Sequence, residues 1–118
     1  MRPEARDAAY LRDIADAGRE AVELIAGVGR QEFATDKQRR LAIERLMTIV
    51  GEAARRVSDA FKGAHPEVPW SGMIAFRNVL IHDYGTIVVD RVWHIVSTQV
   101  PPMLDAVKPL LSEPPGDS

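Results

Sequence analysis

The sequence of 118 residues contains no cysteine. This absence excludes a disulfide framework, a thiolate zinc site, an iron–sulfur cluster and a cysteine nucleophile. Long apolar runs are also missing, and none approaches the roughly 20 residues that span a bilayer. The charged N-terminal segment lacks the apolar region of a signal peptide. We therefore expect a cytoplasmic protein that does not enter a membrane.

A strong excess of either charge is absent as well, since the formal net charge is −2. Binding to nucleic acid by bulk charge is thereby excluded, so any contact with RNA needs a local basic patch. Hydrophobic residues make up 46% and charged residues 27%, as in a globular domain. We expect residues 1–111 to form one domain and residues 112–118, which are rich in proline, glycine and acid, to form a flexible C-terminal tail.

Signals for β-strands are scarce, because aromatic residues make up only 6% of the chain and apolar residues recur three and four positions apart. This pattern predicts an all-α fold, an antiparallel bundle of four to five helices. The first helix is expected over about residues 5–28. Thr35 followed by Gln38 resembles a capping box that opens the second helix, and Gly63 is expected to end it.

Proline, glycine and aspartate mark the later helix boundaries. Pro69 suits the first turn of a third helix, which Gly85 is expected to stop or bend. Asp90 is expected to cap the N-terminus of a fourth helix. The pair Pro101 and Pro102 forces a kink or a new helix start.

The second helix carries more apolar surface than one small bundle needs. One stripe is expected to face the core: Ile43, Met47, Val50, Ala54, Val57 and Phe61. A neighbouring stripe is also apolar, mainly because of Leu46 and Ile49. This surplus predicts a homodimer, although a further helix of the same chain could cover it instead.

Residues 77–84, with the sequence RNVLIHDY, bring together a guanidinium, an amide, an imidazole, a carboxylate and a phenol. An imidazole with a pKa of about 6.5 can take a proton from a ribose 2′-hydroxyl, and a guanidinium can clamp the phosphate. These groups suit phosphodiester cleavage without a metal. On one helix, however, Arg77 and His82 lie about 140° apart. They can converge only if the helix bends near Gly85 or if they meet across a dimer axis.

A structural interpretation of the same residues stays open. Arg77 would then be an ordinary surface cation, His82 a residue favoured by the helix dipole, and Tyr84 a half-buried aromatic. On the second helix, Arg45 and Arg56 share a stripe with Gln38 and Glu52. The default expectation there is a solvated Glu52–Arg56 ion pair, and the functional one is that Arg45 or Arg56 guides RNA phosphates.

The run RNVLIHDY resembles the RxxxxHxY signature of the HepT-like family, within the HEPN superfamily of all-helical nucleic-acid-processing domains. Further blocks agree with the family in order along the chain: YLRDI, FATD, IVGEA, PEVPW, VWHI and PPML. The similarity therefore extends over nearly the whole sequence.

This resemblance implies the homodimeric toxin of a toxin–antitoxin pair, a metal-independent ribonuclease without a cofactor. Its antitoxin would be a minimal nucleotidyltransferase of the MntA-like kind. Arg77 and His82 would be catalytic, Asn78 would bind RNA or orient the imidazole, and Tyr84 would receive AMP from the antitoxin. Two other classes stay open: a non-catalytic HEPN module that binds a nucleotidyltransferase or a nucleotide, and a purely structural helical dimer.

Overall fold

A computed structural model describes residues 4–82 and 86–111, and the side chains of all of these except 79–82 and 86–87. The expected tail, residues 112–118, lies outside the described residues. The described chain contains α1 (Ala5–Leu24), α2 (Arg30–Thr35), α3 (Lys37–Arg56), α4 (Asp59–Ala64), α5 (Trp70–His82), α6 (Thr86–His94), a π-helical turn η1 (Ile95–Gln99) and α7 (Val100–Leu111). None of these helices is long and apolar enough to cross a membrane.

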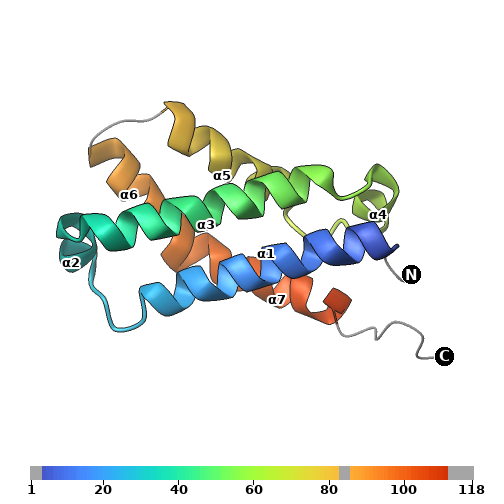
Figure 1. The fold of residues 1–118 in the computed structure, drawn as a ribbon, viewed down its shortest axis with the longest axis horizontal. Coiled ribbons are helices and arrows are strands. Elements are labelled where there is room, and N and C mark those ends of the chain that lie inside the picture. Colours follow the sequence, from blue (N-terminus) through green and yellow to red (C-terminus); the bar gives the residue numbers. More distant parts are fainter. Residues whose placement is uncertain (1–3, 83–85, 112–118) are drawn as a thin grey trace.

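The long helices form an antiparallel bundle in which α3 runs between α1 and α5, with α7 packed against α1 (Figure 1). The expected all-α bundle is confirmed. The four to five helices read from the sequence correspond to α1, α3, α5 and the α6–α7 region. The structure adds two short helices, α2 and α4, which pack at opposite ends of α3.

The core is built around α3. The stripe expected on the second helix is buried and runs from α3 into α4, because six side chains are at most 2% exposed: Ile43, Met47, Val50, Ala54, Val57 and Phe61. On the neighbouring stripe Leu46 is also buried, whereas Ile49 is half-buried. Part of the apolar surplus that predicts a homodimer is therefore covered within one copy of the chain, and the homodimer itself stays a prediction.

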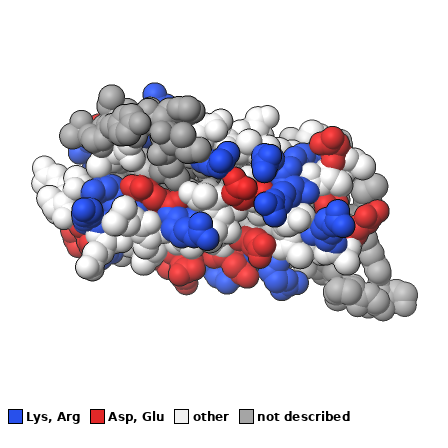
Figure 2. All heavy atoms as spheres, turned by 45° about the horizontal axis from the view of Figure 1, so that its top comes forward, with Lys and Arg blue, Asp and Glu red and all other residues white. Residues whose placement is uncertain are grey.

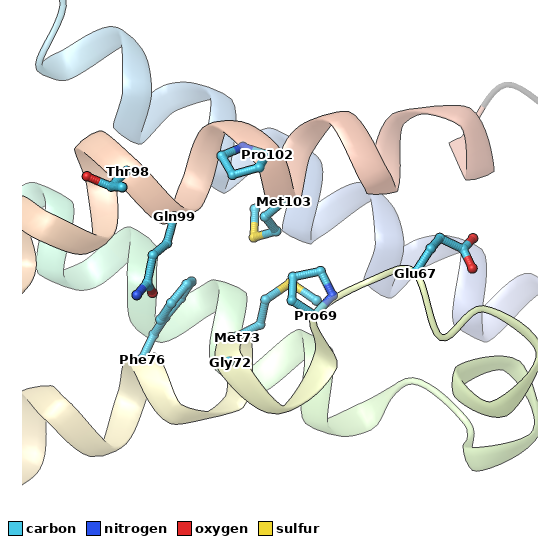
Figure 3. Close-up of a pocket in the computed structure, with 9 residues that line it drawn as sticks. All are labelled: Glu67, Pro69, Gly72, Met73, Phe76, Thr98, Gln99, Pro102 and Met103. Atoms are coloured by element: carbon cyan, nitrogen blue, oxygen red, sulfur yellow. The ribbon is translucent and has the colours of Figure 1, made fainter.

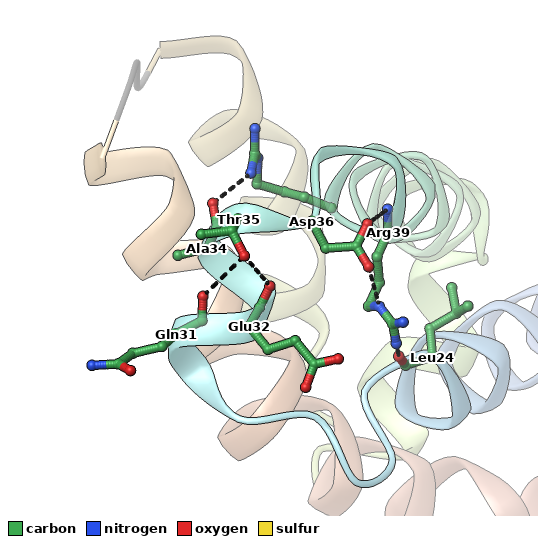
Figure 4. Close-up of polar contacts among 8 residues, drawn as sticks. Leu24, Gln31, Glu32, Ala34, Thr35, Asp36 and Arg39 are labelled. Carbon is green, nitrogen blue, oxygen red and sulfur yellow. Dashed lines mark hydrogen bonds and ion pairs between the residues drawn. The ribbon is translucent and has the colours of Figure 1, made fainter.

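The expected capping box at Thr35 is wrong, because the N-cap of α3 is Asp36 (Figure 4). The Asp36 carboxylate accepts hydrogen bonds from the backbone N–H of Arg39 at 3.1 Å and from its Nε at 3.0 Å. These hydrogen bonds lower the pKa of Asp36. Arg39 also donates to the carbonyl oxygen of Leu24 at 2.7 Å, which ties the end of α1 to the start of α3. Thr35 instead ends α2 and donates to the carbonyl oxygen of Glu32.

The second helix was expected to continue to Gly63, but it breaks after Arg56. The break is fixed by Asp7 of α1, whose carboxylate accepts from the Ser58 N–H at 2.8 Å and from its Oγ at 2.6 Å. Ser58 in turn caps α4 by accepting from the N–H of Phe61. The apolar spacing runs through this break without interruption, so spacing alone does not predict it, although serine is a residue type typical of an N-cap.

Replacing Asp7 by alanine is expected to lower the free energy of unfolding by about 1.5–3 kcal/mol, because Asp7 is only 4% exposed and hydrogen bonds to a charged group contribute on that order. Urea unfolding followed by circular dichroism measures the change. Asp16→Ala is the matched control, since Asp16 lies on the same helix in an exposed ion pair with Arg19 that contributes little. Equal effects of the two substitutions would contradict this role of Asp7.

In the C-terminal half, the expected N-cap at Asp90 is wrong. Asp90 lies within α6 rather than at its N-cap, and its carboxylate forms an ion pair with Arg30 of α2. The new start at Pro101 and Pro102 is confirmed, because both lie in the first turn of α7. Proline has no N–H and its ring clashes with the carbonyl four residues earlier. The chain meets this constraint by widening into η1 just before the two prolines.

Candidate active site

Arg77 lies on α5 at a point where this helix packs closely against α3. The approach depends on Gly51 of α3, because a Cβ atom there would lie 3.1 Å from the carbonyl oxygen of Met73 and 3.3 Å from the Cβ of Arg77. Any larger residue at position 51 would press on the α5 backbone. The spacing of the two helices at Arg77 is therefore set by a residue on α3.

The side chain of Arg77 is held at the surface by Glu52. Its Nε lies 2.8 Å from Glu52 Oε1, and the guanidinium-bearing side chain remains 45% exposed. The second carboxylate oxygen of Glu52 lies 3.8 Å from Arg55. The expected Glu52–Arg56 pair is wrong, because the Glu52 carboxylate binds Arg55 and Arg77 instead. The contact with Glu52 uses one of the five N–H donors of the Arg77 guanidinium.

Glu52 also joins Arg77 to a hollow between α1 and α3. The hollow has a volume of about 220 Å³, and its polar lining consists of Tyr10, Asp13, Arg45, Thr48, Glu52 and Arg56. Three residues of the stripe predicted on the second helix therefore line one site: Arg45, Glu52 and Arg56. Gln38, the first member of that stripe, does not line it. Tyr10 and Asp13 are not predicted from the sequence, because only the packing of α1 on α3 brings them to this hollow.

The remaining residues of the motif are only partly within the described structure. Asn78 is exposed on α5 next to Arg77. His82 is the last residue of α5, and its side chain lies outside the described part. Tyr84 and Gly85 lie entirely outside the described residues. The convergence of Arg77 with His82 therefore stays a prediction.

The surface over α3 carries charges of both signs. Figure 2 shows Lys and Arg side chains interspersed with Asp and Glu side chains on this face, so no continuous basic field covers it. Any binding of a polyanion here must depend on individual cations whose charge is not already neutralised by a carboxylate.

A larger pocket of about 430 Å³ lies between α5 and the η1–α7 segment. Figure 3 shows Met73 and Phe76 of α5 opposite Met103 and Pro102 of α7. Among the residues that line this pocket, Glu67 is the single ionisable one, and no basic side chain accompanies it. The pocket is larger than the hollow beside Glu52, but it does not carry the reactive groups of the motif.

The comparisons with known proteins agree on the ribonuclease class. The family model described as "Ribonuclease HepT-like" matches residues 14–110. The chain therefore belongs to the HepT-like ribonuclease family, and this confirms the resemblance read from the RxxxxHxY motif. No solved structure matches the chain.

Two relatives each match more than three quarters of the chain. The chain is 38% identical over 96 residues to "Probable ribonuclease HepT" of Thermococcus cleftensis, covering 78% of this chain and 84% of the relative. It is 37% identical over 93 residues to "Putative RNase MJ1380" of Methanocaldococcus jannaschii, covering 79% of this chain and 85% of the relative.

Proposed function

We propose that the chain is a metal-independent endoribonuclease in which Arg77 and His82 carry the reaction. The observation that carries this proposal is the placement of Arg77. The first residue of the family motif stands exposed on α5 and is held by Glu52 at 2.8 Å, in a chain whose family model spans residues 14–110. The names of its relatives support RNA as the substrate.

The proposed reaction needs only groups of this chain and of the RNA. The His82 imidazole takes the proton of a ribose 2′-hydroxyl, and the 2′-oxygen attacks the adjacent phosphorus. The bond from phosphorus to the 5′-oxygen breaks, and that oxygen takes up the proton that the His82 imidazole had accepted. The Arg77 guanidinium stabilises the charge that grows on the phosphate. Asn78, the neighbour of Arg77, would bind the RNA or orient the imidazole.

Cleavage of RNA by the purified chain tests this proposal. A labelled single-stranded RNA incubated with the protein in excess EDTA should be cut into discrete fragments on a denaturing gel. An RNA that stays intact in EDTA, and is also intact when magnesium is supplied, would refute the ribonuclease. Cutting that requires magnesium would refute only its metal independence.

Glu52→Gln is expected to lower the kcat of this cleavage about 10-fold or more, because a positioned group that loses its geometry costs rates of this order or above. The KM should not rise, since removing the carboxylate leaves the positive charge of Arg77 more available to phosphate. Glu44→Gln is the matched control, because Glu44 lies on the same helix and pairs with Arg40. A rise in KM with unchanged kcat would mean that Glu52 does not position Arg77.

We further propose that the protein acts as the toxin of a toxin–antitoxin pair and works as a homodimer. A second copy supplies one of the two ways in which Arg77 and His82 can meet, and half-buried Ile49 remains on the surface of α3. Light scattering at micromolar concentration should give twice the chain mass of 13.1 kDa. A monomer under these conditions would remove the shared site.

A further inference from the structure

The arginines that line the hollow between α1 and α3 differ from the other arginines of α3 in their contacts with carboxylates. Elsewhere on α3, Arg39, Arg40 and Arg55 each lie within 4.0 Å of a carboxylate. Arg45 and Arg56, which line the hollow, have no carboxylate within that distance among the described residues. Their charges are therefore available to an anion, and a guanidinium binds phosphate oxygens well.

The two arginines stand toward opposite ends of the hollow. Arg56 comes eleven positions after Arg45, so their Cα atoms lie about 16 Å apart along a helix at 1.5 Å per residue. That separation suits two phosphates of one short strand. Between them the hollow offers different chemistry, because Asp13 and Glu52 contribute carboxylates that would repel a third phosphate.

Tyr10 supplies an aromatic surface to the hollow. It is half-buried on α1 and lines the hollow. Its hydroxyl has no hydrogen-bond partner among the described residues. An aromatic ring beside carboxylate acceptors suits a nucleobase, which has a face for stacking and N–H groups to donate.

We propose that this hollow is a base-binding subsite for single-stranded RNA. One unpaired base stacks on Tyr10, Asp13 accepts a hydrogen bond from the base, and Arg45 and Arg56 bind backbone phosphates on either side of that nucleotide. The inference rests on the proposed ribonuclease function and extends it. Because Glu52 lines the hollow and also binds Arg77, the bound base lies next to the arginine of the cleavage motif. Duplex RNA, whose bases are stacked and paired, cannot fill the subsite.

Binding measurements on the full chain test the subsite. The probe is a fluorescent single-stranded RNA with 2′-O-methyl groups, which cannot undergo attack by a 2′-hydroxyl. Tyr10→Leu should weaken binding about 5- to 150-fold, the range found for loss of one base–aromatic stack, and Tyr10→Phe should bind as the wild type does. Arg45→Ala should weaken binding and flatten its salt dependence. Arg19→Ala is the charge-matched control, since Arg19 lies on α1 and lines a different pocket, beside α7.

The outcomes separate the subsite from the ribonuclease. If wild type cleaves unmodified RNA while Tyr10→Leu and Arg45→Ala bind the probe as tightly as wild type, the subsite is refuted and the ribonuclease stands. Equal affinity for a duplex of the same sequence would also refute the subsite. A wild type that neither binds nor cleaves RNA refutes both.

A second measurement serves if Tyr10→Leu fails to fold. Wild-type protein is irradiated with RNA that contains 5-iodouridine and then digested with trypsin. The crosslink should fall on the peptide of residues 7–12, which contains Tyr10. Crosslinks confined to other peptides would refute the proposal.

Discussion

Arg77→Ala and His82→Ala should each slow RNA cleavage about 10²- to 10⁴-fold, the usual cost of losing a positioned acid–base group or a group that stabilises developing charge. The two losses have different causes. Without His82 no imidazole accepts the proton of the 2′-hydroxyl, and without Arg77 the charge on the phosphate is not stabilised. Initial rates on single-stranded RNA in EDTA measure both. Expression of the wild type should slow or stop growth, and each variant should relieve this effect.

Two control variants test whether the loss of cleavage activity is specific to the motif. His94→Ala removes an exposed imidazole at the end of α6, and Arg19→Ala removes an exposed guanidinium on α1. Both should cleave as the wild type does. Thermal melting should show that all four variants are folded. A folded Arg77→Ala or His82→Ala with full activity would show that the residue is not catalytic.

Tyr84→Phe should keep cleavage but escape silencing by the proposed antitoxin. The phenol is not the proposed base, so its loss leaves the reaction intact. In wild type, AMP on the Tyr84 hydroxyl would add bulk and a phosphate charge close in sequence to Arg77 and would compete with RNA for that guanidinium. Intact-mass measurement after incubation with the cognate nucleotidyltransferase and ATP follows the modification.

Tyr10→Phe is the matched control for this experiment, because it removes the other tyrosine hydroxyl of the chain. It should gain the adenylyl mass, whereas Tyr84→Phe should not. Equal gain by wild type and Tyr84→Phe would mean that another group accepts AMP. If wild type gains no mass yet is silenced, inhibition by binding alone would replace the proposed modification.

The helices and the face of α3 that packs into the core could be predicted because both follow from local spacing. The six-residue stripe from Ile43 to Phe61, which continues past the end of α3 into α4, is buried in the structure. The same spacing does not predict the break at Ser58, because that break depends on Asp7, which lies 51 residues away in the sequence. The N-cap was misplaced by one residue, since Thr35 and Asp36 are both good caps and tertiary contacts of Arg39 favour Asp36.

The candidate site could be predicted only as a set of residue types. The sequence singled out Arg77 and the stripe with Arg45 and Arg56, but it paired Glu52 with Arg56. In the structure Glu52 instead reaches the next helix and binds Arg77, a contact that requires the close approach at Gly51. The spacing of residues within one helix does not predict such contacts between helices. It also does not predict that Tyr10 of α1 lines the hollow.

The chemical nature of the ends left on cut RNA tests the central claim most directly. Attack by the 2′-oxygen, with His82 as base and Arg77 at the phosphate, must leave a 2′,3′-cyclic phosphate on one fragment and a 5′-hydroxyl on the other. Mass spectrometry of fragments made by purified wild type in EDTA should find these ends, and His82→Ala should yield none. Fragments that end in a 3′-hydroxyl and a 5′-phosphate, formed equally by His82→Ala, would contradict the account.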